Sequence, residues 1–130
     1  MIKPPEASPS VRRVLIVDDE DAIRSVLSAI LEDEGYHVQA ATDGEALSIA
    51  AGEPHPDLLL LDVMMPVMNG PEIRRRLLQN PRTAEIPVVV MTAAGDAARW
   101  ATQLGAAGSL QKPFDLLHLV ELVDRLAVRG

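Results

Sequence analysis

Aliphatic runs that end at polar side chains constrain the fold more than any other feature of this sequence. Residues 14–17 and 58–61 are unbroken runs of Val, Leu and Ile, and aspartate follows each of them. Thr92 closes a third apolar run, and Lys112 closes a fourth, shorter one. Such runs are typical of strands buried on both faces, as in parallel sheets. Because the carboxyl ends of parallel strands line one edge of the sheet, we expect these polar side chains to gather there.

Helical signals separate the strand signals. Apolar residues at amphipathic spacing, together with Gly, Pro and Asn-Gly turns, predict five helices between and after the strands. The expected strands are 14–17, 37–41, 58–61, 88–91 and 108–112. The expected helices begin near Asp19, Asp43, Pro71, Gly95 and Asp115, and they end near Gly35, Gly52, Pro81, Leu104 and Val128.

Five strand–helix units in alternation predict an α/β protein. Right-handed crossovers and short connections favour a doubly wound three-layer sandwich of the flavodoxin-like type, with a five-stranded parallel sheet in the order 2-1-3-4-5. In that order the topological switch lies between the first and third strands, which carry Asp18, Asp19 and Asp62. The ligand crevice and the acidic side chains are therefore expected to coincide.

Composition narrows the class of protein. The 130 residues suit one domain, here expected to span residues 11–130, while the proline-rich residues 1–10 are expected to form a flexible tail. A net charge of −7 disfavours binding to nucleic acid, whose main attraction is to basic side chains. No apolar run approaches the roughly 18 residues of a membrane span, and the polar start is unlike a signal peptide. We therefore expect a cytoplasmic protein that binds neither nucleic acid nor membrane.

The strand-end acids suggest a chemistry. Magnesium prefers oxygen ligands and usually takes one or two carboxylates, so Asp18, Asp19 and Asp62 suit it. Packed carboxylates also repel one another until a cation arrives. Asp62 follows four leucines, and aspartate can attack phosphorus to form an acyl phosphate. The alternatives are a helix N-cap or first-turn role for Asp18 and Asp19, and a solvated turn for Asp62.

Four segments in the right order, each at an expected strand end, carry a family resemblance. They are Val-Asp-Asp-Glu at 17–20, Asp-Val-Met-Met-Pro-Val-Met-Asn-Gly at 62–70, Met-Thr-Ala at 91–93 and Lys-Pro-Phe at 112–114. With them, the chain from Arg12 to Val128 resembles the receiver domain of two-component response regulators. The resemblance implies a single-domain regulator that signals by protein–protein contact and catalyses only its own phosphorylation and dephosphorylation.

The resemblance also implies roles for individual residues. Asp62 would accept a phosphoryl group from a sensor histidine kinase or a histidine phosphotransfer protein. Mg²⁺ would be held by Asp18, Asp19, Asp62 and the backbone carbonyl of Met64. Lys112 and Thr92 would contact phosphoryl oxygens, in keeping with the need for cations and donors around the transferred group. In the family the bond between this lysine and the following proline is typically cis.

The last expected strand departs from the family pattern. Receivers usually carry an aromatic residue or histidine three positions before the lysine, where this chain has Ser109. In the family's usual account that ring rotates when the threonine moves. A serine has no ring, so it cannot transmit the change at the site by ring rotation. The single tryptophan, Trp100, lies on the neighbouring helix. Spacing alone leaves two roles open for it, core packing or an exposed anchor for a partner, and we consider Ser109 and Trp100 together as the output elements.

Alternative functions remain at this point. A phosphorelay shuttle or phosphate sink would use the same site without driving an effector, and Ser109 slightly favours it. A small-molecule phosphatase with an aspartyl-phosphate intermediate is disfavoured, because that type expects Asp-x-Asp on the first strand. A nucleotide or flavin binder is disfavoured because no Gly-rich loop follows residues 14–17. The three histidines lack metal-ligand spacing, and the basic run 74–76 is expected to be a solvated helix face.

Overall fold

The computed structural model describes residues 12–66 and 68–127. Within these residues five strands alternate with five helices along the chain. The strands are β1 (Arg13–Val17), β2 (His37–Ala41), β3 (Leu58–Asp62), β4 (Val88–Thr92) and β5 (Gly108–Gln111). The helices are α1 (Asp21–Asp33), α2 (Glu45–Ala51), α3 (Gly70–Gln79), α4 (Ala97–Leu104) and α5 (Leu116–Leu126). The tail expected at residues 1–10 lies outside the described residues.

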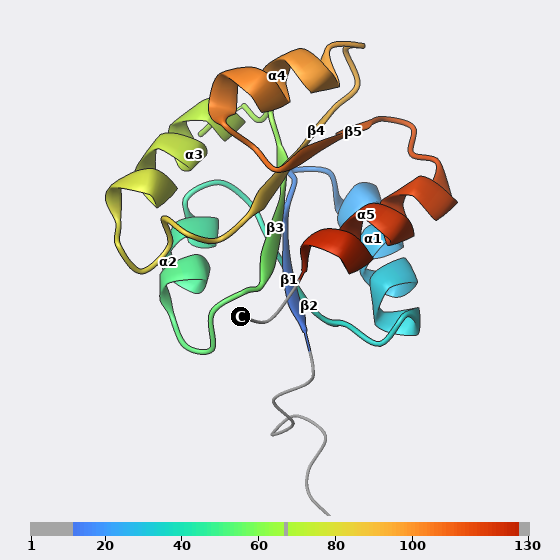
Figure 1. Ribbon diagram of the computed structural model, residues 1–130, viewed down its shortest axis with the longest axis horizontal. Helices are drawn as coiled ribbons and strands as arrows, with labels where there is room; N and C mark the ends of the chain where they lie inside the picture. The colour runs from blue at the N-terminus through green and yellow to red at the C-terminus, as the bar shows by residue number, and fades with distance from the viewer. Residues whose placement is uncertain (1–11, 67, 128–130) are drawn as a thin grey trace, which may run out of the picture.

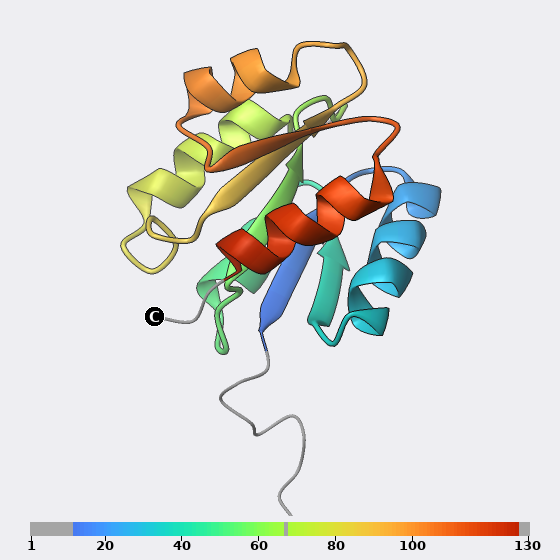
Figure 2. The ribbon, with the colours of Figure 1, turned by 45° about the vertical axis from the view of Figure 1, so that its right-hand side comes forward.

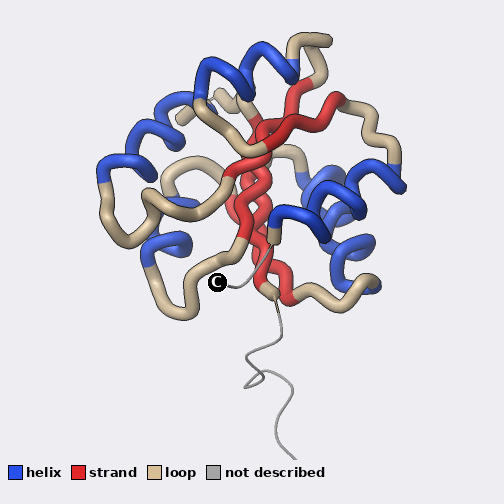
Figure 3. The backbone as a smooth tube through the Cα atoms, in the orientation of Figure 1, coloured by secondary structure: helices blue, strands red, loops and turns tan. Residues whose placement is uncertain are grey.

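The strands form one parallel sheet in the order β2-β1-β3-β4-β5, which confirms the predicted topology. Helices α1 and α5 cover one face of the sheet, and α2, α3 and α4 cover the other (Figure 1). Figure 3 shows the same three layers, with the strands in the centre and helices on both sides. The switch in strand order therefore lies between β1 and β3, as the sequence predicted.

Two hydrophobic cores lie on the two faces of the sheet, and successive strand residues alternate between them. In β1, Val14 and Ile16 join the core beneath α1 and α5, whereas Leu15 and Val17 join the core beneath α2, α3 and α4. The four leucines of β3 divide in the same way. Figure 2 shows α5 and α1 side by side on the first face. Because both faces are covered, these strands are apolar at every position of residues 14–17 and 58–61, which explains the unbroken aliphatic runs.

Several predicted boundaries differ from the structure by one or two residues. Helix α4 begins at Ala97 rather than Gly95, because Gly95 has φ 82° and Asp96 takes the N-cap position. Strand β5 ends at Gln111, so Lys112 is the first residue after the strand. Helix α5 begins at Leu116, because Asp115 is its N-cap and its carboxylate accepts two backbone N–H bonds from the first turn. This helix ends at Leu126, with Ala127 as its C-cap, so the predicted end at residue 128 was two residues too late.

The basic run on α3 is only partly solvated. Arg74 is 9% exposed, and its guanidinium donates to the carbonyls of Leu104 and Gly105 at the end of α4, each at 2.9 Å. The prediction of a solvated side chain was therefore wrong for Arg74. The next two arginines are exposed and pair with Glu72, as expected for a helix face in water. Arg74 ties the two helices on this face of the sheet together.

Candidate functional site

The loop after β1 places one buried and two exposed acids at the edge of the sheet. Asp18 is buried, and its Oδ1 accepts a hydrogen bond from the backbone N–H of Glu20 at 2.9 Å. Asp19 and Glu20 are exposed. The N-cap of α1 is Glu20, so neither aspartate is the helix N-cap that we had considered as an alternative. The polypeptide therefore fixes the Asp18 carboxylate rigidly inside the crevice.

Asp62 is the last residue of β3 and is 4% exposed, which rules out the alternative of a solvated turn. Its Oδ1 accepts a hydrogen bond from the backbone N–H of Met64 at 3.2 Å. The loop that follows folds back tightly. A Cβ atom at Gly70 would lie 2.7 Å from the carbonyl oxygen of Asp62, and the Gly70 N–H donates to the Val63 carbonyl at 3.0 Å. Glycine is required here because the start of α3 lies against the end of β3.

Strand pairing brings Thr92 and Lys112 to the same edge. The backbone N–H of Lys112 donates to the carbonyl of Thr92 at 2.8 Å. Thr92 is fully buried, and its hydroxyl oxygen accepts from the backbone N–H of Ala94 at 3.2 Å. The Lys112–Pro113 peptide bond is cis, as the family resemblance implied. The ends of β1, β3, β4 and β5 thus all contribute to one site, as the strand pattern predicted.

The ammonium of Lys112 lies among three carboxylates. Its Nζ is 2.7 Å from Asp18 Oδ2, 3.1 Å from Glu20 Oε1 and 3.6 Å from Asp62 Oδ2. Burial acts to lower the pKa of Lys112, but hydrogen bonds to Asp18 and Glu20 and the charge of Asp62 raise it overall. Burial and the charge of Asp18 raise the pKa of Asp62 to about 6, and the attraction of Lys112 offsets them only in part. The expected carboxylate repulsion is therefore present.

One cluster of acidic oxygens among the described residues has the spacing of a cation site. Carboxylate oxygens of Asp18, Glu20 and Asp62 lie within 4.8 Å of one another. Glu20 occupies the place in this cluster that the sequence had suggested for Asp19, which lines a neighbouring cleft instead. The signal for Glu20 was its position as the third residue in the acidic run 18–21. An all-oxygen donor set of this kind suits a hard divalent cation.

Two open clefts meet at Met64, whose side chain is exposed. The first has a volume of about 270 Å³ and leads to Asp62, with polar walls from Glu20, Thr92 and Lys112. Two alanines of the loop after β4 complete its rim. The second contains Asp19, five residues of the β3–α3 loop, and the ring of Trp100. A reactant therefore reaches Asp62 through a small polar opening with partly apolar edges.

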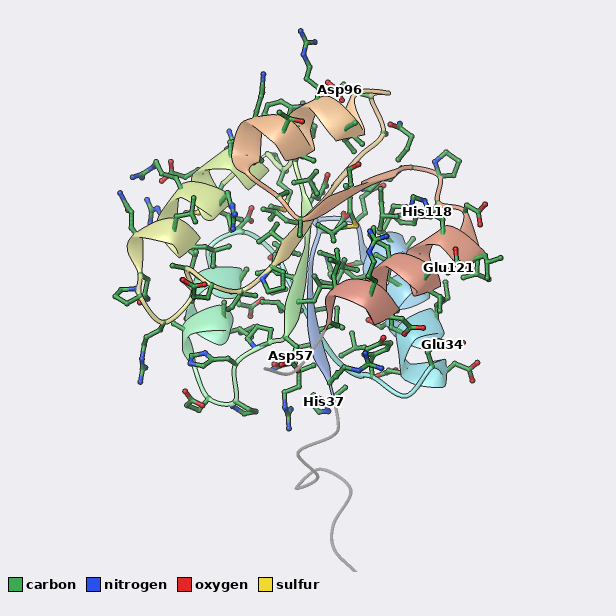
Figure 4. The ribbon with its side chains drawn as sticks, in the orientation of Figure 1. Glu34, His37, Asp57, Asp96, His118 and Glu121 are labelled. Atoms are coloured by element: carbon green, nitrogen blue, oxygen red, sulfur yellow. The ribbon has the colours of Figure 1, made fainter. Side chains whose placement is uncertain are left out.

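Trp100 packs partly into the core, and its role as an anchor for a partner stays a prediction. It is half-buried and packs against the core beneath α2, α3 and α4, and its indole N–H donates to Asp96 Oδ2 at 3.1 Å. Figure 4 shows Asp96 at the start of α4. The ring also lines the cleft that contains Asp19 and Met64. Ser109 is half-buried in β5 and adds no bulky side chain there.

The histidines do not contribute to the site. His37 and His118 lie far apart in Figure 4, the first at the foot of the sheet and the second on α5. His55 pairs with Glu53, at 2.8 Å, and contacts the carbonyl of Ala50. In the described part of the chain, the group of possible metal ligands includes no histidine, as the lack of ligand spacing predicted.

A model of the response regulator receiver domain matches residues 14–124. The chain belongs to this family. The chemotaxis protein CheY4 from Vibrio cholerae has the same fold, with a TM-score of 0.80. It is 32% identical in sequence, and the match covers 90% of this chain and 99% of that chain. The family assignment confirms the predicted fold and the place of the chain in two-component signalling. It favours a receiver domain over the phosphatase and flavin-binding alternatives.

Two further relatives bear on function. The DNA-binding dual master transcriptional regulator RpaA of Synechocystis is 40% identical over 119 residues, which are 90% of this chain and 49% of RpaA. The chain spans about half, or less, of the length of the curated relatives it matches. The receiver domain of the Pseudomonas aeruginosa sensor histidine kinase PA1611 is 27% identical, with a TM-score of 0.79 and coverage of 91% and 98%. Its structure contains a magnesium ion coordinated in the active-site cleft.

Helices long and apolar enough to cross a membrane are absent from residues 12–66 and 68–127.

Proposed function

We propose that this receiver accepts a phosphoryl group on Asp62 from a sensor histidine kinase or a histidine phosphotransfer protein, and that it signals by contact with another protein. One observation carries the proposal. A buried carboxylate at the end of β3 lies 3.6 Å from a lysine ammonium, and two further acids complete the cluster around it. Family membership supports the class of donor, because receiver domains act in two-component systems.

Asp62 is the nucleophile in the proposed step. One of its oxygens forms a bond to phosphorus while the bond between phosphorus and the donor's histidine nitrogen breaks. The electron pair of that bond stays on the nitrogen, and the product is an aspartyl phosphate. A pKa of about 6 leaves the carboxylate of Asp62 ionised at neutral pH, so it can attack without a separate base.

Lys112 and Thr92 act on the transferred group. The Lys112 ammonium offsets negative charge on the phosphoryl oxygens, which is the main catalytic requirement of phosphoryl transfer. The hydroxyl oxygen of Thr92 accepts a bond from the Ala94 N–H, so its own hydrogen is available to donate to a phosphoryl oxygen.

Asp18, Asp19, Asp62 and the backbone carbonyl of Met64 are the groups that would hold Mg²⁺. The carboxylate cluster of Asp18, Glu20 and Asp62 supports this role for Asp18 and Asp62, because it supplies only oxygen donors and carries more negative charge than Lys112 neutralises. The role of Asp19 rests on the family resemblance. When bound, the cation supplies positive charge next to the phosphoryl oxygens. The magnesium ion in the active-site cleft of the PA1611 receiver supports Mg²⁺ as the cation of this site.

Intact-mass measurement after incubation with a small phosphodonor and Mg²⁺ tests the proposal. We expect one acid-stable, base-labile phosphoryl group on the wild type and none on Asp62→Asn. Asp33→Asn, an exposed acid on α1, is the matched control and should be labelled like the wild type. Unchanged labelling of Asp62→Asn would place the nucleophile elsewhere.

A shuttle or phosphate sink is the second candidate, and Ser109 favours it. Strand β5 offers Gly108, Ser109, Leu110 and Gln111, so it has no aromatic side chain to carry a change outward. A shuttle would pass the group from Asp62 to the histidine of a phosphotransfer protein without a large change in its own surface. Amide hydrogen exchange in α4, α5 and β5, measured with and without phosphorylation, separates the two roles: protection changes beyond the loops indicate a signalling output.

A further inference from the structure

Lys112 makes its side-chain hydrogen bonds to acids of the β1–α1 loop and none to the proposed phosphoacceptor. Its ammonium donates hydrogen bonds to Asp18 at 2.7 Å and to Glu20 at 3.1 Å, whereas Asp62 Oδ2 lies at 3.6 Å. The last distance is beyond hydrogen-bond range but within range of charge attraction. In the unphosphorylated protein the lysine is therefore held by hydrogen bonds to the β1–α1 loop and by charge attraction alone to Asp62.

The two carboxylates that hold the lysine differ in mobility. Asp18 is buried, and the backbone N–H of Glu20 orients its carboxylate. The Glu20 side chain is 59% exposed and makes no cap bond to α1, although Glu20 occupies the N-cap position. It reaches instead across the crevice from the β1–α1 loop to the residue after β5. Of the two contacts, the one from Glu20 is therefore the more easily released.

We infer that Glu20 is a positioning residue that restrains Lys112 in the unphosphorylated protein and releases it when the phosphoryl group arrives. This inference rests on the proposed function of Asp62. Because Glu20 holds the lysine only before transfer, its contact stabilises the starting state more than the transition state. Such a contact slows transfer, and its loss should accelerate it.

Glu20 also belongs to the acidic cluster, so a role as a metal ligand is the competing explanation. The two roles differ in their effect on Mg²⁺. A ligand contributes directly to metal affinity, whereas a residue that restrains Lys112 changes the affinity only through its charge. A variant that removes the same charge from the same turn without touching Lys112 separates them.

Asp21 provides that matched control. It is the first residue of α1, it is exposed, and its carboxylate pairs with Arg24 rather than with Lys112. Glu20→Gln and Asp21→Asn each remove one negative charge next to the crevice. The chain contains only two lysines, Lys3 and Lys112, so the side-chain ¹⁵N signal of Lys112 can be assigned with Lys112→Arg.

The first measurement is the ¹⁵Nζ resonance of Lys112 in Mg²⁺-free protein. We expect Glu20→Gln to shift this resonance and Asp21→Asn to leave it in place. The second is the rate constant of phosphorylation by a small phosphodonor at saturating Mg²⁺. We expect Glu20→Gln to react about two- to fivefold faster than Asp21→Asn, the range set by loss of one partly exposed ion pair. The Mg²⁺ affinities of the two variants should agree.

Three results would overturn the inference. Equal rates for the two variants, with or without a shift of the Lys112 resonance, would mean that the contact does not restrain the reaction. An unshifted resonance in Glu20→Gln would mean that Glu20 does not hold the lysine in solution. Mg²⁺ binding about tenfold weaker in Glu20→Gln than in Asp21→Asn would make Glu20 a metal ligand. If the wild type takes up no phosphoryl group, the proposed function fails, and the resonance still decides whether Glu20 holds Lys112.

Discussion

Lys112 Nζ lies 3.6 Å from Asp62 Oδ2, so the two groups attract each other without a hydrogen bond. The attraction is too weak to offset the burial of Asp62 and the charge of Asp18, and the pKa of Asp62 is raised to about 6. In the metal-free protein the ionised carboxylate of Asp62 is therefore a source of instability. This imbalance underlies the first two predictions.

The first prediction concerns stability and pH. Because the pKa of Asp62 is higher in the folded than in the unfolded protein, the folded state binds the proton more tightly. The protonated carboxyl of Asp62 therefore stabilises the folded state fully below pH 4, and this stabilisation is lost as the pH rises to about 6 and the carboxyl ionises. At pH 7.5 without metal, Asp62→Asn should exceed the wild type in free energy of unfolding by on the order of 2 kcal/mol.

Urea denaturation of the wild type and Asp62→Asn between pH 4 and pH 8 checks this prediction. The difference between the two proteins should shrink toward the acid end of the range, where the wild-type carboxyl is protonated. A difference that is constant with pH would contradict the raised pKa, since Asn does not titrate.

The second prediction concerns metal. Mg²⁺ should raise the melting temperature of the wild type, because it binds the folded carboxylates and relieves their repulsion. At a concentration 100 times the dissociation constant, the gain is about 2.7 kcal/mol. Asp19→Ala should reduce the thermal shift, and Asp33→Ala, on the outer face of α1, should leave it unchanged. Absence of any thermal shift or calorimetric signal at millimolar Mg²⁺ would contradict the acidic site as a cation site.

The third prediction concerns the contact between α3 and α4. Arg74→Ala removes both bonds to the end of α4 and leaves the partly buried carbonyls of Leu104 and Gly105 without their donor. The free energy of unfolding should fall by about 2 kcal/mol or more. Arg75→Ala, on the exposed side of the same helix, should leave stability nearly unchanged. Midpoints of urea denaturation measure both, and equal midpoints would contradict the bridging role of Arg74.

The fold could be predicted from sequence because its signals are local. Unbroken aliphatic runs such as 58–61 appear only where both faces of a strand are covered, and Gly and Pro mark the turns between them. The same logic placed Asp62, Thr92 and Lys112 at one edge, since all parallel strands end there. None of these inferences required knowledge of a particular long-range contact.

The errors arose where a residue's role depends on a distant partner. Arg74 looked like part of a solvated basic run, but the end of α4 supplies two carbonyls that accept hydrogen bonds from its buried guanidinium. From sequence alone Glu20 had no assigned role in the site, yet its carboxylate contacts Lys112, 92 positions along the chain. Sequence spacing does not predict either contact, because both contacts depend on how the helices and strands pack together.

The last prediction concerns output. Trp100 is the only tryptophan, and its ring lines the cleft that contains Asp19 and Met64. Without an aromatic side chain at Ser109, we expect a change at Asp62 to pass to α4 through this cleft. Adding beryllofluoride and Mg²⁺, which imitate the phosphorylated state, should change Trp100 fluorescence beyond the change with Mg²⁺ alone. Lys112→Ala should lose that additional change. An unchanged spectrum, together with unchanged amide exchange across α4, would reject coupling through Trp100 and favour the shuttle or sink role.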